Sequence, residues 1–228
     1  MKLSVKYQPT TLNDVVGQPR IIHRLKTLVM EPYPCCILME GRGGVGKSAT
    51  AKALANDLNI PEYGGLYRYN GARLRIEDVE RLFSETFTLA PMFGSPWYML
   101  LIEEMELLPS ANVYSALKDY LSEQNHPDRL IVVATSNDTT KLYEKDDAFM
   151  QRFDGHIFPF SCGPSFAEAC LDRLNMIWQN EVGADVPMPP EVASMGWKND
   201  AYSMRRALAV LGAAVEIRRA LQGSEVAA

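Results

Sequence analysis

The feature that most constrains the fold is a glycine-rich segment that fits the pattern G-x-x-x-x-G-K-[S/T] at every fixed position: Gly41-Arg42-Gly43-Gly44-Val45-Gly46-Lys47-Ser48. An apolar run over 35–39 precedes it and is typical of a buried strand, while 49–58 is rich in helix formers. Strand, glycine loop and helix in this order are the context in which the motif holds phosphates. We therefore predict a phosphate site here; the alternative is a glycine-rich turn that binds nothing.

Each part of the loop has an expected role. Glycines let backbone N–H groups turn inward around a phosphate chain, where a Cβ would collide, and the following helix start adds a positive dipole. We expect the backbone from Gly41 to Ala49 to surround the phosphates. Lys47 would contact the β- and γ-phosphates, and the Ser48 hydroxyl would bind Mg²⁺.

Composition excludes several classes of protein. No apolar run reaches the roughly 20 residues that cross a bilayer, and the N-terminus lacks the apolar centre of a signal peptide, so we expect a cytoplasmic protein without membrane contact. The four cysteines lack CxxC spacing, which argues against a zinc site or a disulfide framework. The net charge of −5 argues against strong autonomous nucleic-acid binding, although a local basic patch within an assembly remains open.

Apolar strands alternate with helical stretches up to residue 160, which predicts an α/β fold with a parallel sheet between two helix layers. The expected strands are 35–39, 66–70, 97–102, 130–135 and 157–160; the expected helices are 19–30, 49–58, 76–89 and 110–123. Beyond this point we expect helices and no strand. The predicted domains are a P-loop core over 1–162 and a small all-helical lid over 163–228.

Two carboxylates follow the apolar strand over 97–102. The carboxyl edge of a parallel sheet beside a phosphate loop is where Mg²⁺ and an attacking water are held. We expect Glu103 to support the hydrated Mg²⁺ and Glu104 to polarise the water. The alternative is two solvated acids at the start of a helix, where negative charge suits the helix dipole.

Three further residues are weak indications taken singly. Asn137, after the strand over 130–135, could hydrogen-bond the γ-phosphate or orient the water, although asparagine also favours polar turns. Arg152 could stabilise phosphoryl charge in a neighbouring subunit, or be an ordinary surface arginine. In the pair Arg205-Arg206, one guanidinium could reach the phosphates, or both could be solvated on a helix.

Taken together, these residues are a specific indication because of their order along the chain. This order resembles that of the motifs in AAA+ ATPases of the clamp-loader branch, such as replication factor C small subunits and the phage clamp-loader ATPase subunit. The stretch from Tyr7-Gln8-Pro9 to Val15-Val16-Gly17-Gln18 resembles the box that lines the adenine pocket in that family. Ser136-Asn137 resembles the sensor-1 strand end, Gln151-Arg152-Phe153 the Ser-Arg-Cys box, and 203–208 the sensor-2 helix, with Arg205 as the matching arginine. The resemblance covers nearly all of 1–222.

The resemblance implies an ATPase that uses ATP and Mg²⁺, with Tyr7, Pro9, Val15 and Val16 around the adenine. It implies an oligomer with other AAA+ subunits, a sliding clamp or other replication protein as partner, and DNA as a further partner. Loading or remodelling of a protein on DNA is the implied task.

The DNA contacts that the resemblance implies fall on basic residues after the second strand and in the fourth helix. The matching side chains here are Arg73, Arg75 and Lys118, and ordinary surface charges are the alternative.

Three departures from the family pattern keep alternatives open. Glu103 stands where that family has Asp, the Ser-Arg-Cys box keeps only its arginine, and we expect the collar domain to be lacking. A nucleotide-dependent adaptor or helicase-loader module with little hydrolysis is the main alternative, and a small-molecule kinase is a weaker one.

Overall fold

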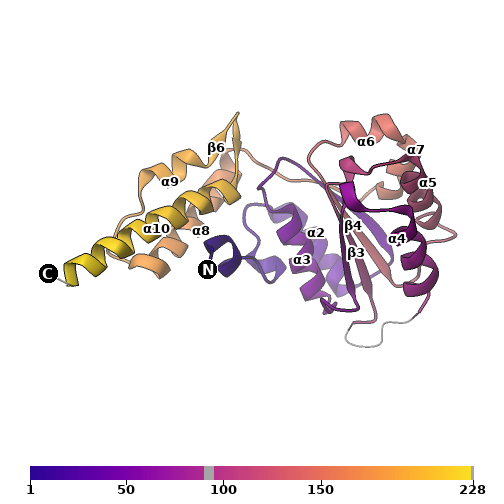
Figure 1. The fold of residues 1–228 in the computed structure, drawn as a ribbon, viewed down its shortest axis with the longest axis horizontal. Helices are drawn as coiled ribbons and strands as arrows, with labels where there is room; N and C mark the ends of the chain where they lie inside the picture. Colours follow the sequence, from indigo (N-terminus) through magenta and orange to yellow (C-terminus); the bar gives the residue numbers. More distant parts are fainter. Residues whose placement is uncertain (90–94, 227–228) are drawn as a thin grey trace.

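The computed structural model describes residues 1–89 and 95–226, so the last two residues of the predicted lid lie outside it. Its centre is a parallel sheet with the strand order β2-β3-β4-β1-β5. The strands are β1 Cys35–Glu40, β2 Leu66–Asn70, β3 Tyr98–Glu103, β4 Leu130–Ser136 and β5 Ile157–Pro159. All five strands were predicted, and the three-layer α/β fold is confirmed (Figure 1).

The two faces of the sheet pack against different helices because successive side chains of a strand point to opposite faces. In β1, Ile37 and Met39 join one core cluster with α2 and α3, whereas Cys36 and Leu38 join a second cluster with α4 and α5. Strands covered on both faces are continuous apolar runs, which explains why the sequence revealed them.

Helices cover both faces of the sheet (Figure 1). Those of the core are α2 Pro19–Met30, α3 Lys47–Asp57, α4 Ile76–Arg81, α5 Ala111–Tyr120, α6 Thr140–Lys145 and α7 Asp147–Met150. The predicted helix over 76–89 is shorter than expected, because α4 passes at Leu82 into a π-helical turn that ends at Thr86.

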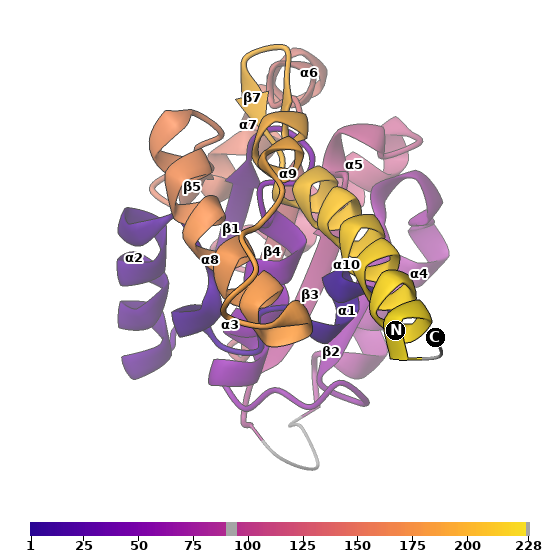
Figure 2. The ribbon, with the colours of Figure 1, turned by 90° about the vertical axis from the view of Figure 1, so that its left-hand side faces the viewer.

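The C-terminal part, which we call the lid, contains α8 Pro164–Val182, α9 Pro190–Met195 and α10 Met204–Val226. The prediction of an all-helical lid was wrong in one detail, because a short hairpin joins α9 to α10. Its strands are β6 Trp197–Lys198 and β7 Ala201–Tyr202, with Asn199 and Asp200 both at positive φ in the turn. Such two-residue turns suit hairpins, but strands this short leave no alternating pattern in the sequence. Figure 2 shows α8 and α10 in front of the core, with β7 near one end of α10.

The N-terminal helix α1 Leu3–Lys6 packs against α10 and therefore lies beside the lid (Figure 1). A buried carboxylate fixes it there. Glu181 of α8, whose side chain is 3% exposed, accepts hydrogen bonds from Lys6 (2.5 Å), from the Tyr7 hydroxyl (2.6 Å) and from Arg219 of α10 (2.5 Å). These donors hold the pKa of Glu181 below its usual range. Within residues 1–89 and 95–226, no helix is long and apolar enough to span a membrane.

Candidate functional site

A pocket of about 480 Å³ lies between the core and the lid. Its walls come from the N-terminal segment, the glycine loop, the carboxyl ends of β2, β3 and β4, and helices α8 and α10. Of the residues predicted for the site, the pocket is lined by Tyr7, Pro9, Val15, Val16, Gly43, Gly44, Val45, Gly46, Lys47, Ser48, Ala49, Glu103, Glu104, Asn137 and Arg205. Segments far apart in the chain therefore meet in one cavity.

The glycine loop has backbone conformations that require glycine. Gly44 has φ +90°, and a Cβ there would lie 2.1 Å from the Ser203 hydroxyl of the lid. Gly46 has φ +104° and precedes the first residue of α3 without any side-chain cap. The first-turn N–H groups of a helix lack intrahelical partners, and here no capping side chain takes one, so they suit an anion.

Lys47 is the buried cation of the loop, with 7% of its surface exposed. Its ammonium group donates to the carbonyl oxygens of Gly41 and Arg42 and, over 3.0 Å, to Oδ1 of Asn137. Burial lowers the pKa of Lys47 from its ordinary 10.5 to about 8. A cation held by neutral oxygens rather than by a carboxylate is suited to receive an anionic ligand.

The two carboxylates at the end of β3 both line the pocket, but each has a partner on β2. Glu103 forms an ion pair with Arg68 (3.4 Å), and Oε2 of Glu104 accepts from the Asn70 amide (2.9 Å). Glu104 has φ +56°, a left-handed conformation that is unusual for a non-glycine residue. Its backbone N–H donates to the Thr135 hydroxyl of β4, which helps to hold this turn. Glu104 is therefore fixed at the sheet edge and directed toward Asn70.

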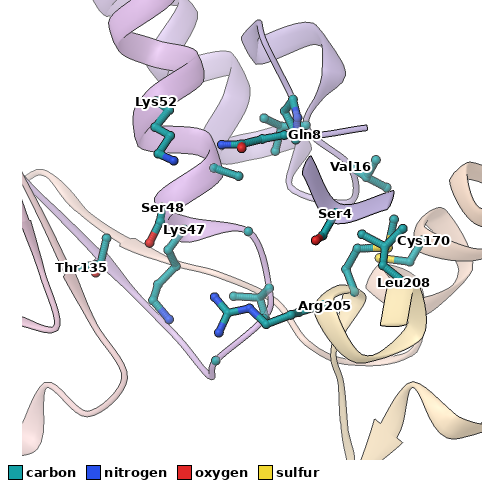
Figure 3. A pocket seen from close by; sticks show the side chains of 18 of the residues that line it. Ser4, Gln8, Val16, Lys47, Ser48, Lys52, Thr135, Cys170, Arg205 and Leu208 are labelled. Carbon is teal, nitrogen blue, oxygen red and sulfur yellow. The ribbon is translucent and has the colours of Figure 1, made fainter. Parts of the chain in front are cut away.

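Two polar groups approach the loop from different parts of the chain. Asn137 follows β4 and contacts Lys47, while Arg205 lies in the first turn of α10 and its backbone N–H donates to the Gly44 carbonyl (3.4 Å). Figure 3 shows the Arg205 guanidinium directed toward the side of the loop where the Lys47 side chain lies. The lid thus contributes a cation at the same place as the core.

The opposite end of the pocket is mainly apolar. Val15 and Val16 of the N-terminal segment line it together with Phe166 and Cys170 of α8 and Leu208 of α10. An apolar slot beside a phosphate-type loop suits the flat face of a nucleobase. The lid residues were missed, because apolar residues at helical spacing in α8 and α10 look like ordinary core.

Three of the predicted site residues do not line the pocket. Gly41 lies beneath the loop, where its N–H donates to the Ser136 carbonyl, and Arg42 turns outward to donate to the Asn199 carbonyl of the lid hairpin (2.7 Å). Arg152 lies in a separate shallow hollow with Lys118, whose carbonyl accepts from its Nε (3.2 Å). A role for Arg152 in a neighbouring subunit stays a prediction.

Sequence reasoning also missed polar residues at the site. Asn70, Lys52 and Arg173 line the pocket, and Glu106 lies behind Asn137 and binds it. Lys52 lies four residues after Ser48 on α3 and therefore on the same side of the helix, so helical spacing could have revealed it. The contacts of Asn70 and Glu106 join residues more than thirty positions apart and leave no local signal.

The residues present fit a magnesium nucleotide. Ser48 and Glu103 both line the pocket and offer hydroxyl and carboxylate oxygens, which are the ligands that Mg²⁺ prefers. Gly44 leaves room where a Cβ would meet the lid, and Lys47 lies beside it without a carboxylate partner among the residues described.

The residues expected to contact DNA lie outside the pocket. Arg73 and Arg75 are exposed around the turn after β2. Lys118 of α5 is partly buried and pairs with Asp146 (2.7 Å). Their proposed contact with DNA therefore does not involve residues that line the pocket.

Comparison with known proteins agrees with this geometry. Residues 37–159 match the family described as ATPase family associated with various cellular activities (AAA). The chain is 35% identical to the replication factor C small subunit of Archaeoglobus fulgidus over 119 residues, which cover 50% of this chain and 36% of that protein. It is 27% identical to the same subunit of Staphylothermus marinus over 216 residues, covering 93% of this chain and 61% of that protein.

Solved structures share the fold. A RuvB variant from Thermotoga maritima superposes with a TM-score of 0.65 at 18% identity, covering 90% of this chain and 64% of that chain. The Orc1 protein of Aeropyrum pernix, solved in complex with DNA, superposes with a TM-score of 0.61 at 16% identity, covering 88% of this chain and 59% of that chain. The curated relatives cited above are longer proteins, of which this chain covers between 36% and 61%.

Proposed function

Because this chain belongs to the AAA family of ATPases and is clamp-loader-like, we propose that it binds ATP with Mg²⁺ and hydrolyses it to load or remodel a protein on DNA. The proposed substrate is ATP, the proposed products are ADP and phosphate, and a sliding clamp is the first candidate partner. The observation that carries the proposal is the meeting of Lys47, Glu104, Asn137 and Arg205 around one pocket or its phosphate loop.

The proposed division of labour follows from the contacts. Lys47 exchanges the carbonyl oxygens that now hold it for the β- and γ-phosphates. Ser48 and Glu103 would hold Mg²⁺, which supplies charge neutralisation at the phosphates when bound. Glu104 polarises the attacking water, which requires its carboxylate to leave Asn70, and Asn137 holds the water or the γ-phosphate.

The nucleotide would also set the position of the lid. Arg205 lies in the first turn of the lid helix α10, so a bond from its guanidinium to the γ-phosphate would draw α10 toward the loop and would be lost after hydrolysis. Arg152, outside this pocket, would act on the nucleotide of an adjoining subunit. The relatives named replication factor C small subunit support such an assembly with a clamp and DNA.

Turnover measurements test the proposal. Phosphate release should be measured on the chain alone, with DNA, and with DNA plus a sliding clamp, and Lys47→Ala should lose nucleotide binding. Release that rises with the clamp and DNA supports the loading task. Phosphate that appears on a small acceptor instead of in solution would indicate a kinase.

A nucleotide-dependent adaptor is the second candidate, and a specific observation favours it. Both carboxylates of the β3 end are engaged by β2, Glu103 by Arg68 and Glu104 by Asn70, which is an arrangement suited to low turnover. ATP that binds but shows no turnover under any of the above conditions would support the adaptor.

A further inference from the structure

Glu106 is a buried carboxylate that does not line the pocket. It lies in the short helix η4 Met105–Leu107, directly after the Glu104 turn, and is 7% exposed. Its own backbone carbonyl accepts from Lys145 of α6 (3.1 Å), which ties this turn to a second element. Burying a carboxylate is costly unless it has firm partners, so its contacts indicate what it does.

Those contacts converge on one residue. The backbone N–H and the side-chain Nδ2 of Asn137 both donate to Oε1 of Glu106, each over 3.0 Å. Oε2 is buried and has no hydrogen-bond partner among the described residues. Half of the carboxylate is thus left unsatisfied while the other half holds both the backbone and the side chain of Asn137.

The two neighbours of the Asn137 amide fix which way it faces. The Lys47 ammonium can only donate, so the atom 3.0 Å from it is the oxygen Oδ1. Oε1 of Glu106 accepts, so the atom facing it is the nitrogen Nδ2. An asparagine amide alone is free to flip, but here a cation on one side and a carboxylate on the other select a single orientation.

We propose that Glu106 is a positioning residue that holds the Asn137 amide in the orientation needed at the γ-phosphate, an inference that rests on the proposed nucleotide function. When the Lys47 ammonium group binds the phosphates instead, Asn137 loses its hydrogen bond to Lys47. Its hydrogen bonds to Glu106 remain, so Oδ1 and the second Nδ2 hydrogen stay available on the pocket side. Glu106 itself touches neither nucleotide nor water and acts through Asn137.

Kinetics of a double-mutant cycle test this role at pH 7. Glu106→Ala should lower kcat by about 10- to 100-fold, as expected for a misplaced catalytic group, while ATP affinity changes by less than about threefold. Asn137→Ala should produce a similar loss. The double variant should be no slower than Asn137→Ala alone, because Glu106 has no other target.

Two further variants separate positioning from general support. Glu106→Gln keeps an oxygen acceptor of the same shape, so kcat should stay within about fivefold of the wild type. Glu144→Ala, an exposed glutamate of α6, is the matched control and should change nothing. If Glu106→Ala is insoluble, Glu106→Met takes its place, because it fills a similar volume without an acceptor.

Several outcomes would overturn the inference. Losses that multiply in the double variant would give Glu106 an independent role, and a fall in ATP affinity as large as the fall in kcat would make it a structural support of the pocket. If the wild type shows no turnover at all, the proposed ATP hydrolysis is refuted, and the role of Glu106 is then tested by nucleotide-binding measurements alone. The preference for a non-hydrolysable ATP analogue over ADP should then fall in Glu106→Ala as it does in Asn137→Ala; an unchanged preference refutes the role.

Discussion

The buried lysine of the phosphate loop makes nucleotide affinity depend on pH. Burial lowers the pKa of Lys47 from 10.5 to about 8, which corresponds to about 3 kcal/mol of lost stabilisation of its charged form. A triphosphate placed on the ammonium group restores that stabilisation and raises the pKa again. Above pH 8 the free protein therefore holds a neutral Lys47, and binding must take up a proton.

The magnitude follows from the titration. At pH 7 about nine-tenths of Lys47 is charged in the free protein, and at pH 9 about one-tenth, so ATP affinity should fall roughly tenfold between these values. Proton uptake at pH 9 should approach about 0.9 per ATP bound. Calorimetric titration in two buffers of different ionisation enthalpy measures both quantities.

Lys47→Arg provides the control, because a guanidinium stays charged across this range. Its affinity for ATP should be weaker than that of the wild type but flat between pH 7 and 9. If the wild-type affinity is equally independent of pH and no proton is taken up at pH 9, the argument is refuted. The pKa of Lys47 would then not be lowered in the free protein and raised again by the ligand.

Four further outcomes are expected. Glu104→Gln should keep ATP binding and lose turnover by about 100-fold or more, measured by phosphate release. Asn70→Asp keeps the oxygen that caps Ala72 but removes the donor to Glu104, so basal phosphate release should rise; no change would mean that this bond does not limit turnover. Arg152→Ala should lower turnover only in assembled protein, and an equal loss in the isolated monomer would contradict a role in trans. Gly44→Ala strains a positive φ and collides with the lid, so ATP binding measured by fluorescence should be lost while the core stays folded.

Local patterns were enough to predict most of the core. The strands are buried on both faces and appear as apolar runs, and the loop before Lys47 has a fixed spacing that strand and helix must flank. The carboxyl edge of a parallel sheet then brings Glu104 and Asn137 together, whatever the intervening sequence does. These predictions depended on short stretches of chain or on topology.

The remaining features depend on contacts that no short stretch reveals. Arg42 belongs to the loop motif, yet it points outward to a hairpin that the sequence did not predict. Glu106 and Glu104 differ by two positions and look equivalent in the sequence, but one lines the pocket and the other lies behind Asn137. The left-handed backbone of Glu104 changes the direction of the chain at this turn, and we attribute the different side-chain directions of Glu104 and Glu106 to it.

The anchoring of α1 by Glu181 changes how the lid is joined to the core. Besides the chain that enters α8 at Pro164, a second connection runs from the lid-bound Tyr7 back into the core at Leu12, whose N–H donates to Asp57 of α3 (2.9 Å). A lid that is joined to the core at two points can rotate as a rigid body only about the line between those points. The second connection depends on the ion pair between Lys6 and Glu181, so high salt should weaken this connection and allow the lid to rotate in a further direction.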